Sequence, residues 1–174
     1  MADVRADTLA LFDASAPVAP TELTGVWRGA ELPTGNMMDG LLEATGWYGK
    51  RFTSPEEVDP LLFFGPHGKL VRVNPALMPM GAPPQVFELA KAASRAVRPV
   101  VASLRTFRPA ARLREVRYRG VVSTAMLYDD LPILDHFRRL NETTLIGAMD
   151  YRKNPDPLFF TLRAVPAEKA PVIR

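Results

Sequence analysis

The stretch that decides the fold is residues 128–152, which read YDDLPILDHFRRLNETTLIGAMDYR. Side chains of different character alternate along residues 133–140 and again along residues 145–151, and a period of two indicates β-strands. The short Asn-Glu-Thr segment between the two runs indicates a turn. The stretch is therefore predicted to form an antiparallel hairpin.

This hairpin carries ionisable side chains among apolar ones. Asp135, His136 and Asp150 all lie on the two predicted strands. Packing alone does not explain them, because a buried charge needs a partner. Neighbours on a strand point to opposite faces, so Asp135 and His136 are not expected to touch. The sequence leaves open which face of residues 133–140 points inward, so the candidate site includes residues from both.

The rest of the chain contains further short segments typical of strands. They are residues 47–52, 61–64, 69–74, 113–119, 121–128 and 158–163. Helices are expected at residues 3–14, at residues 37–44 and, with a kink near Pro99, at residues 85–104. Seven or eight strands with a few helices predict a mainly β protein, built as a closed or nearly closed antiparallel barrel.

Three connecting segments give weaker predictions. Residues 54–57, Ser-Pro-Glu-Glu, are typical of a helix start, with serine as the cap and proline at the first position. Residues 75–84 contain four prolines and two methionines without a regular period, which indicates an ordered loop or a lid. The tail, residues 167–174, is expected to be loose.

Composition excludes several classes of protein. The 174 residues are 47% hydrophobic and 24% charged, as in ordinary soluble globular proteins. The absence of cysteine excludes disulfide scaffolds and thiol nucleophiles, and two histidines argue against a His-rich zinc site. The charged start lacks the apolar core of a signal peptide, and no apolar run reaches the roughly 18 residues of a membrane span. A cytoplasmic protein that needs no cofactor is predicted.

Positive charge is concentrated in one part of the chain. Residues 91–119 contain nine Lys or Arg against one Glu, a local net charge of +8. Such a stripe is one mark of nucleic-acid binding. Here it matches no nucleic-acid motif and contains few aromatic residues, so a solvated face is the better interpretation and no nucleic-acid partner is expected.

Two groups of motifs resemble a known family. GVWRG at residues 25–29, PTG at residues 33–35 and WYGKRF at residues 47–52 resemble the GXWXG-motif domain. The hairpin stretch and FFTLR at residues 159–163 resemble the uncharacterised domain that usually follows it. The resemblance implies a calycin-like or lipocalin-like barrel with an apolar interior pocket. One departure is Asn36, where family members often have histidine.

Within one predicted barrel domain, residues 1–174, the resemblance implies three parts. Residues 21–75 are the GXWXG-like half, residues 76–110 are a loop and helix, and residues 111–165 are the C-terminal strands. The α-pinene oxide lyases, bacterial enzymes that open a bicyclic terpene epoxide, are similar to this family. The resemblance therefore implies a small hydrophobic molecule as the partner.

Four residues are candidates for proton transfer: Asp135, His136, Asp150 and Lys50. Imidazole titrates near neutral pH, and a half-buried acid either pairs with a cation or has a raised pKa. His136 also fits a hydrogen-bonded structural role, and Lys50 also fits a surface position with a packed stem. The candidates for contact with the substrate are Trp27, Asp39, Trp47, Tyr48, Phe52, Phe137, Met149 and Phe160. Trp27 also fits a plug at one end of the barrel.

Three functions remain open. The first is a cofactor-independent lyase or isomerase that opens a small terpenoid epoxide, because this needs only an acid, a base and a dry apolar pocket. The second is a non-catalytic carrier of a fatty acid or similar ligand, with a buried cation on the carboxylate. The third is a barrel filled by its own side chains that acts through its surface. The sequence does not decide whether the chain forms a homodimer.

Overall fold

A computed structural model describes residues 3–174, and strands dominate it. The strands of this range are β1 (Gly25–Leu32), β2 (Trp47–Ser54), β3 (Glu57–Phe64), β4 (Leu70–Arg72), β5 (Ala111–Tyr118), β6 (Val121–Tyr128), β7 (Ile133–Asn141), β8 (Thr144–Tyr151) and β9 (Asn154–Ala164). The α-helices are α1 (Val4–Ala14), α2 (Leu41–Thr45), α3 (Pro84–Ala92) and α4 (Ser94–Ser103). Short 3-10 turns lie at Pro20–Glu22, Pro66–Gly68, Pro75–Leu77 and Ala167–Lys169.

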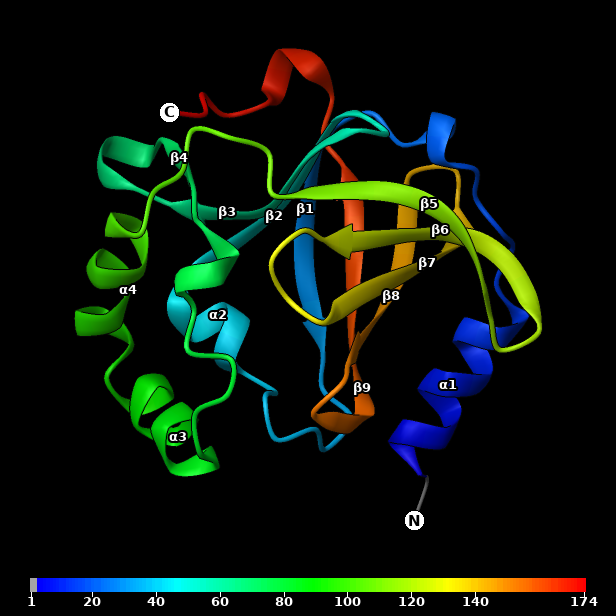
Figure 1. The fold of residues 1–174 in the computed structure, drawn as a ribbon, viewed down its shortest axis with the longest axis horizontal. Coiled ribbons are helices and arrows are strands. Elements are labelled where there is room, and N and C mark those ends of the chain that lie inside the picture. Colours follow the sequence, from blue (N-terminus) through cyan, green and yellow to red (C-terminus); the bar gives the residue numbers. More distant parts are fainter. Residues whose placement is uncertain (1–2) are drawn as a thin grey trace.

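Eight of these strands form a closed antiparallel barrel. The pairing order is β2-β1-β9-β8-β7-β6-β5-β3, and β2 also pairs with β3, which closes the ring (Figure 1). The remaining strand, β4, pairs with β3 outside the ring. The prediction of a mainly β antiparallel barrel is confirmed.

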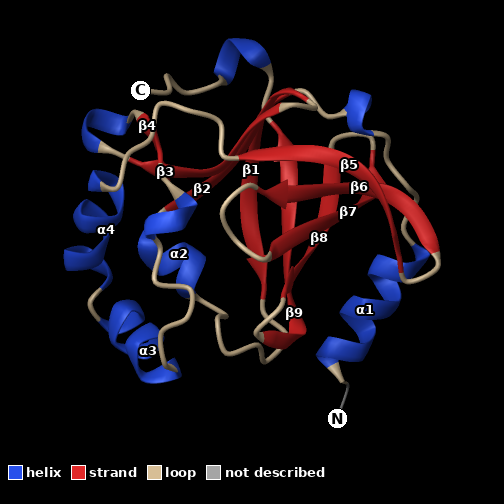
Figure 2. Ribbon diagram, in the orientation of Figure 1, coloured by secondary structure: helices blue, strands red, loops and turns tan. Residues whose placement is uncertain are grey.

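The helices lie on two sides of the barrel. Figure 2 shows α1 on one side and α2, α3 and α4 together on the other. Phe12 of α1 is fully buried against Ile146, Ala148 and Phe159 on the outer surface of β8 and β9. Because α1 covers this surface, the strands beneath it are apolar on both faces, which explains the dense hydrophobic pattern of the hairpin stretch.

The hairpin predicted from residues 128–152 is confirmed. β7 pairs with β8 from Ile133 opposite Tyr151 to Asn141 opposite Thr144, so a two-residue turn joins them. Ile133 and Phe137 belong to the interior core, and Asp135 lies on the same face. His136 and Arg138 therefore point outward. This answers the question of orientation that the sequence left open.

Three local predictions were wrong. The Ser-Pro-Glu-Glu segment forms the turn between β2 and β3 instead of a helix, since a serine hydroxyl also supports turns: the Ser54 hydroxyl accepts from the Glu56 N–H at 3.3 Å. Residues 85–104 form two helices that separate at Ala93, so that both pack on α2, while Pro99 lies within α4. The tail is not loose, because Ile173 pairs with Leu70 of β4.

Glycines allow aromatic side chains to enter the barrel. A Cβ at Gly29, the second glycine of the GVWRG motif, would lie 2.2 Å from the Trp47 ring. A Cβ at Gly147 would lie 2.3 Å from the ring of Phe160, its partner across the β8–β9 ladder. Trp47 and Phe160 meet edge to face, with ring centroids 5.7 Å apart. The two glycines thus provide the space for one continuous aromatic wall.

We expect Gly29→Ala and Gly147→Ala each to destabilise the protein by about 1–3 kcal/mol, the usual cost of overpacking a dense core. The free energy of unfolding from urea titration measures the effect. Gly81→Ala is the matched control, because its Cβ would meet only the flexible end of Lys153, at 3.3 Å. Equal stability of all three variants would contradict the aromatic-wall packing.

Candidate functional site

The centre of the site is an ion pair inside the barrel. Lys50 Nζ lies 2.7 Å from Asp135 Oδ2, and the two side chains are 2% and 1% exposed. Lys50 stands on β2 and Asp135 on β7, which are four strands apart in either direction around the ring. The pair therefore joins opposite walls of the barrel across its interior.

Neighbouring groups complete the coordination of the ammonium group. Lys50 Nζ also donates to the Pro60 carbonyl at 3.1 Å and approaches the Tyr128 hydroxyl at 3.4 Å. The same hydroxyl lies 3.4 Å from Asp135 Oδ2. The other oxygen of this carboxylate, Oδ1, is buried and has no hydrogen-bond partner within residues 3–174.

Aromatic rings surround the cation. The Lys50 nitrogen lies 5.2 Å from the ring centroid of Phe160, 5.6 Å from that of Trp47 and 5.7 Å from that of Tyr128. Rings at this distance attract a positive charge through their electron-rich faces. The site is therefore arranged to hold a positive charge in an environment with little water.

Burial shifts the proton affinities of the site. It lowers the pKa of the Lys50 amine, and the Asp135 carboxylate partly opposes this shift. Burial and the same carboxylate raise the pKa of the Tyr128 phenol well above its ordinary value. The phenol thus stays protonated, whereas the amine gives up its proton more readily than a lysine in water.

An apolar cavity opens above the pair. Its lining residues are Met38, Leu41, Leu42, Thr45, Trp47, Lys50, Leu61, Phe63, Met78, Met80, Tyr128, Leu131, Ile133, Asp135, Met149, Leu158 and Phe160. Met78, Met80 and Leu131 are partly exposed and mark its mouth, whereas Lys50 and Asp135 are buried at its base. The loop of residues 75–84, predicted from its prolines, supplies both methionines.

The cavity is small in this conformation. Its volume is about 50 Å³. An apolar cavity of about 150 Å³ binds benzene, so this space is smaller than a six-carbon ring requires. Beside it, Phe137 and Phe52 fill the barrel with their rings 5.9 Å apart, and Trp27 packs on Phe52 at 6.4 Å.

A bulge at Gly49 brings Trp47 and Lys50 onto the same face. In a regular strand, residues three positions apart point to opposite faces. The register of β2 shifts at Gly49, whose φ of +150° brings its Cβ position within 1.9 Å of the Trp27 carbonyl oxygen, so only glycine fits there.

Some of the predicted site residues line the cavity and others do not. Those that line the cavity are Lys50, Asp135, Trp47, Met149 and Phe160. Trp27, Phe52 and Phe137 lie in the core without lining the cavity. Tyr48 points outward, because of the bulge, and packs with Val26, Leu62 and Leu70.

His136 and Asp150 lie on the outer face of the barrel, so of the two faces that the sequence left open it is the face of Asp135 that reaches the cavity. His136 is buried and stacks on Tyr118, with ring centroids 3.8 Å apart. Its Nε2 lies 3.8 Å from Asp150, whose side chain is half exposed, and has no hydrogen-bond partner within residues 3–174. Burial lowers the pKa of His136, opposed mainly by the Asp150 carboxylate.

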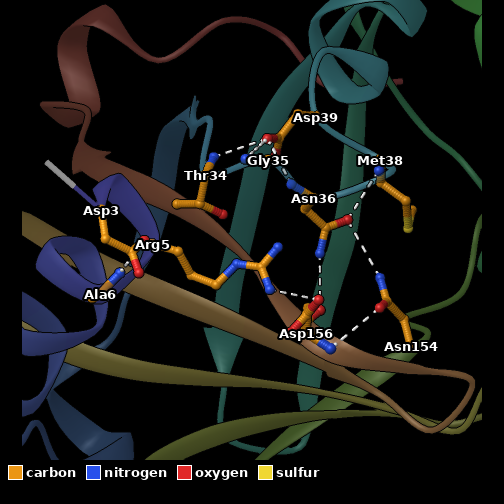
Figure 3. Close-up of polar contacts among 10 residues, drawn as sticks. All are labelled: Asp3, Arg5, Ala6, Thr34, Gly35, Asn36, Met38, Asp39, Asn154 and Asp156. Carbon is orange, nitrogen blue, oxygen red and sulfur yellow. Dashed lines mark hydrogen bonds and ion pairs between the residues drawn. The ribbon is translucent and has the colours of Figure 1, made fainter. Parts of the chain in front are cut away.

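Asp39 and Asn36 hold the loop beside the cavity instead of lining it (Figure 3). Asp39 Oδ2 accepts the backbone N–H groups of Thr34, Gly35 and Asn36 at 2.8–3.0 Å. Asn36 Nδ2 donates to the Asp156 carbonyl at 2.8 Å, and its Oδ1 accepts from the Met38 N–H at 2.9 Å. Asn36, which replaces the common histidine, therefore ties this loop to β9 and positions Met38 on the cavity wall.

Sequence reasoning missed Tyr128 as a site residue. Tyr128 lies two positions after Met126, whose partner across the β6–β7 ladder is Asp135. The period of two along β6 places Tyr128 and Met126 on one face. The alternating pattern of β6 therefore pointed to Tyr128, but this prediction required knowing that β6 pairs with β7.

Fold and site together define a closed antiparallel barrel with a cation–carboxylate pair at the base of an apolar cavity. The family model described as "GXWXG protein" matches residues 10–68, and "Domain of unknown function (DUF4334)" matches residues 109–164. The solved structure titled "Crystal structure of protein from Thermomonospora curvata" is 35% identical, with a TM-score of 0.70. The match covers 93% of this chain and 88% of that one.

The chain therefore belongs to the same family as the Thermomonospora curvata protein, with a GXWXG segment followed by a DUF4334 domain. No curated protein matches the sequence. Among residues 3–174, no three His, Asp or Glu side chains are grouped to hold a metal ion. No helix in this part of the chain is long and apolar enough to cross a membrane.

We expect Lys50→Met to destabilise the protein by about 3–5 kcal/mol, because it leaves the Asp135 carboxylate buried without a counter-ion. The double variant Lys50→Met/Asp135→Leu should recover most of this loss, since no uncompensated charge remains. Urea denaturation of the single and double variants measures the difference. A single variant as stable as the parent would contradict a desolvated pair.

The shifted pKa of His136 predicts a pH dependence of stability. The folded state binds a proton less readily than the unfolded chain, so stability is lost as pH falls below the ordinary value of 6.5. His136→Phe keeps the stack on Tyr118 and removes the titration. Its free energy of unfolding relative to the parent should therefore be higher at about pH 5 than at about pH 7.5. An unchanged difference would mean that His136 does not titrate on unfolding.

Proposed function

We propose that the protein is a cofactor-independent lyase or isomerase that opens a small, neutral, apolar epoxide by acid–base catalysis. The observation that carries this proposal is the Lys50–Asp135 pair, 2.7 Å apart at the base of an apolar cavity. Epoxide opening needs a proton donor for the oxygen and a base for a neighbouring C–H group. The pair supplies both in one place.

The proposed reaction leaves the pair unchanged after each turnover. The Lys50 ammonium protonates the epoxide oxygen as the C–O bond breaks and leaves a carbocation. Asp135 Oδ1, which has no other partner, removes a proton from the adjacent carbon to form the alkene or carbonyl product. The carboxyl group then turns so that its proton faces the Lys50 amine, and the proton returns across the short contact between the two side chains, which restores the ammonium and the carboxylate. Atoms and charge balance, and solvent takes no part.

The surroundings fit a cationic intermediate. The rings of Trp47 and Phe160 already lie 5.2–5.6 Å from the ammonium charge, and they would face a carbocation in the same way. The low pKa of Lys50 makes the amine a better acid than an exposed lysine. An apolar wall keeps water from adding to the cation.

The pair also favours a neutral substrate over a fatty acid. A carrier was expected to use the buried cation to bind a carboxylate head group. Asp135 already occupies that cation, and a second carboxylate would meet its negative charge in a medium of low polarity. An uncharged epoxide meets no such repulsion.

Access requires the loop of residues 75–84 to move. The cavity, at about 50 Å³, is smaller than the roughly 150 Å³ of an apolar cavity that binds benzene, and a ten-carbon epoxide is larger than benzene. Met78 and Met80 are adaptable side chains at the mouth, and their displacement enlarges the cavity without disturbing a strand. The proposal therefore includes an opening step before chemistry.

Incubating the protein with a panel of terpenoid epoxides and fatty acids, with no added cofactor, tests the proposal. We expect an isomerised product from an epoxide by gas chromatography, and loss of about a hundredfold or more in turnover for Asp135→Asn. Turnover should also decline as pH rises through the lowered pKa of Lys50, below its ordinary 10.5.

His136→Phe and Asp150→Asn are matched controls. Both residues lie on the outer face, so both variants should retain turnover. Circular dichroism confirms that each variant is folded. If a ligand shifts the melting temperature but is recovered chemically unchanged, the protein is a carrier of that ligand. Turnover lost in His136→Phe but kept in Asp135→Asn would refute the assignment of the pair.

A further inference from the structure

The base of the cavity contains a primary amine in an unusual setting. Lys50 is 2% exposed, and apart from its polar contacts it is surrounded by aromatic rings. An amine that is desolvated in an apolar pocket is a nucleophile as well as an acid. Asp135 lies within proton-transfer distance, at 2.7 Å, and is also buried.

We propose that Lys50 forms an imine with a short apolar aldehyde, so that the cavity captures such aldehydes covalently. The inference rests on the same acid–base pair as the proposed function. It needs only that a carbonyl group reaches Lys50, however, and does not require that an epoxide is turned over.

The geometry supplies each proton that the step needs. Transfer of one proton from Lys50 to Asp135 across their 2.7 Å contact gives a neutral amine beside a carboxylic acid. The amine nitrogen attacks the carbonyl carbon, and the oxygen becomes a hydroxyl group. Asp135 then protonates this hydroxyl, which leaves as water. An iminium ion remains beside the carboxylate, so atoms and charge balance.

The pocket also defines the size of the aldehyde. Because the cavity volume is only about 50 Å³, a short chain such as butanal needs less displacement of Met78 and Met80 than a long one. Aldehydes of this kind are neutral, as the paired charges require. The iminium charge would take the position of the ammonium charge, where Trp47, Tyr128 and Phe160 already surround it. Exclusion of water from the site opposes hydrolysis of the imine.

Reductive trapping tests the proposal on the intact protein. Butanal with cyanoborohydride at neutral pH converts an imine to a stable butyl-lysine, which peptide mass mapping locates. We expect Lys50 to be labelled severalfold faster than the exposed Lys153 and Lys169, because burial lowers its pKa and therefore leaves more free amine at neutral pH. Dodecanal, which requires the loop to open, should label Lys50 severalfold more slowly.

Two controls separate capture from general lysine chemistry. His136→Phe, on the outer face, should be labelled like the parent. Asp135→Asn cannot protonate the departing hydroxyl and should be labelled several times more slowly, while Lys153 labelling stays constant. Labelling of Lys50 at or below the rate of the surface lysines overturns the proposal.

The outcomes also distinguish this inference from the lyase. Rapid labelling of Lys50 in a protein that leaves every epoxide unchanged supports aldehyde capture and refutes the lyase proposal. Epoxide turnover without preferential labelling of Lys50 refutes aldehyde capture and supports the lyase proposal. Equal labelling by butanal and dodecanal refutes the assignment to short chains.

Discussion

A lysine and an aspartate that meet across the interior of the barrel are the constraint on which the rest of the structure depends. Lys50 and Asp135 are both buried away from bulk water, so each charge depends on the other for its stabilisation. Their strands lie opposite one another in the ring, and contact therefore requires a closed barrel with the correct register on both sides. Hydrophobic residues of similar volume would fill the same space without the free-energy cost of removing two charges from water. Retention of two charges here favours a chemical role over a purely structural one.

Three glycines are best understood through the groups that lie against them. Gly29 of the GVWRG motif makes room for Trp47, Gly147 for Phe160, and Gly49 lets the backbones of β1 and β2 approach closely. Gly29 and Gly147 thus provide the space in which two aromatic rings enter the barrel. The tryptophan of the motif, Trp27, packs on Phe52 in the core and does not line the cavity.

Much of the fold was predictable because it follows from local patterns. The period of two predicted the β7–β8 hairpin, and the density of short strands predicted the barrel. The site was only partly predictable, because Lys50 and Asp135 are far apart in sequence and no local signal pairs them. Asp150, on the next strand, sits opposite Leu134 on the outer face and lies 3.8 Å from His136, away from Asp135. The bulge at Gly49 likewise leaves Trp47 in the cavity and turns Tyr48 outward, although both were expected to contact the substrate.

The C-terminal residues cover the outer edge of β4. The outer edge of β4 would be an open row of peptide groups, but the Leu70 N–H donates to the Val172 carbonyl, and the Leu70 carbonyl accepts from the Arg174 N–H, both at 2.9 Å. Further along this edge, the Thr106 N–H donates to the Arg72 carbonyl at 3.0 Å. Strands with free edges invite intermolecular sheet growth and fibre formation. Here main-chain groups of Leu70 and Arg72 on the outer edge of β4 already have partners within the molecule, so this edge offers a neighbouring molecule a poorer template for sheet growth.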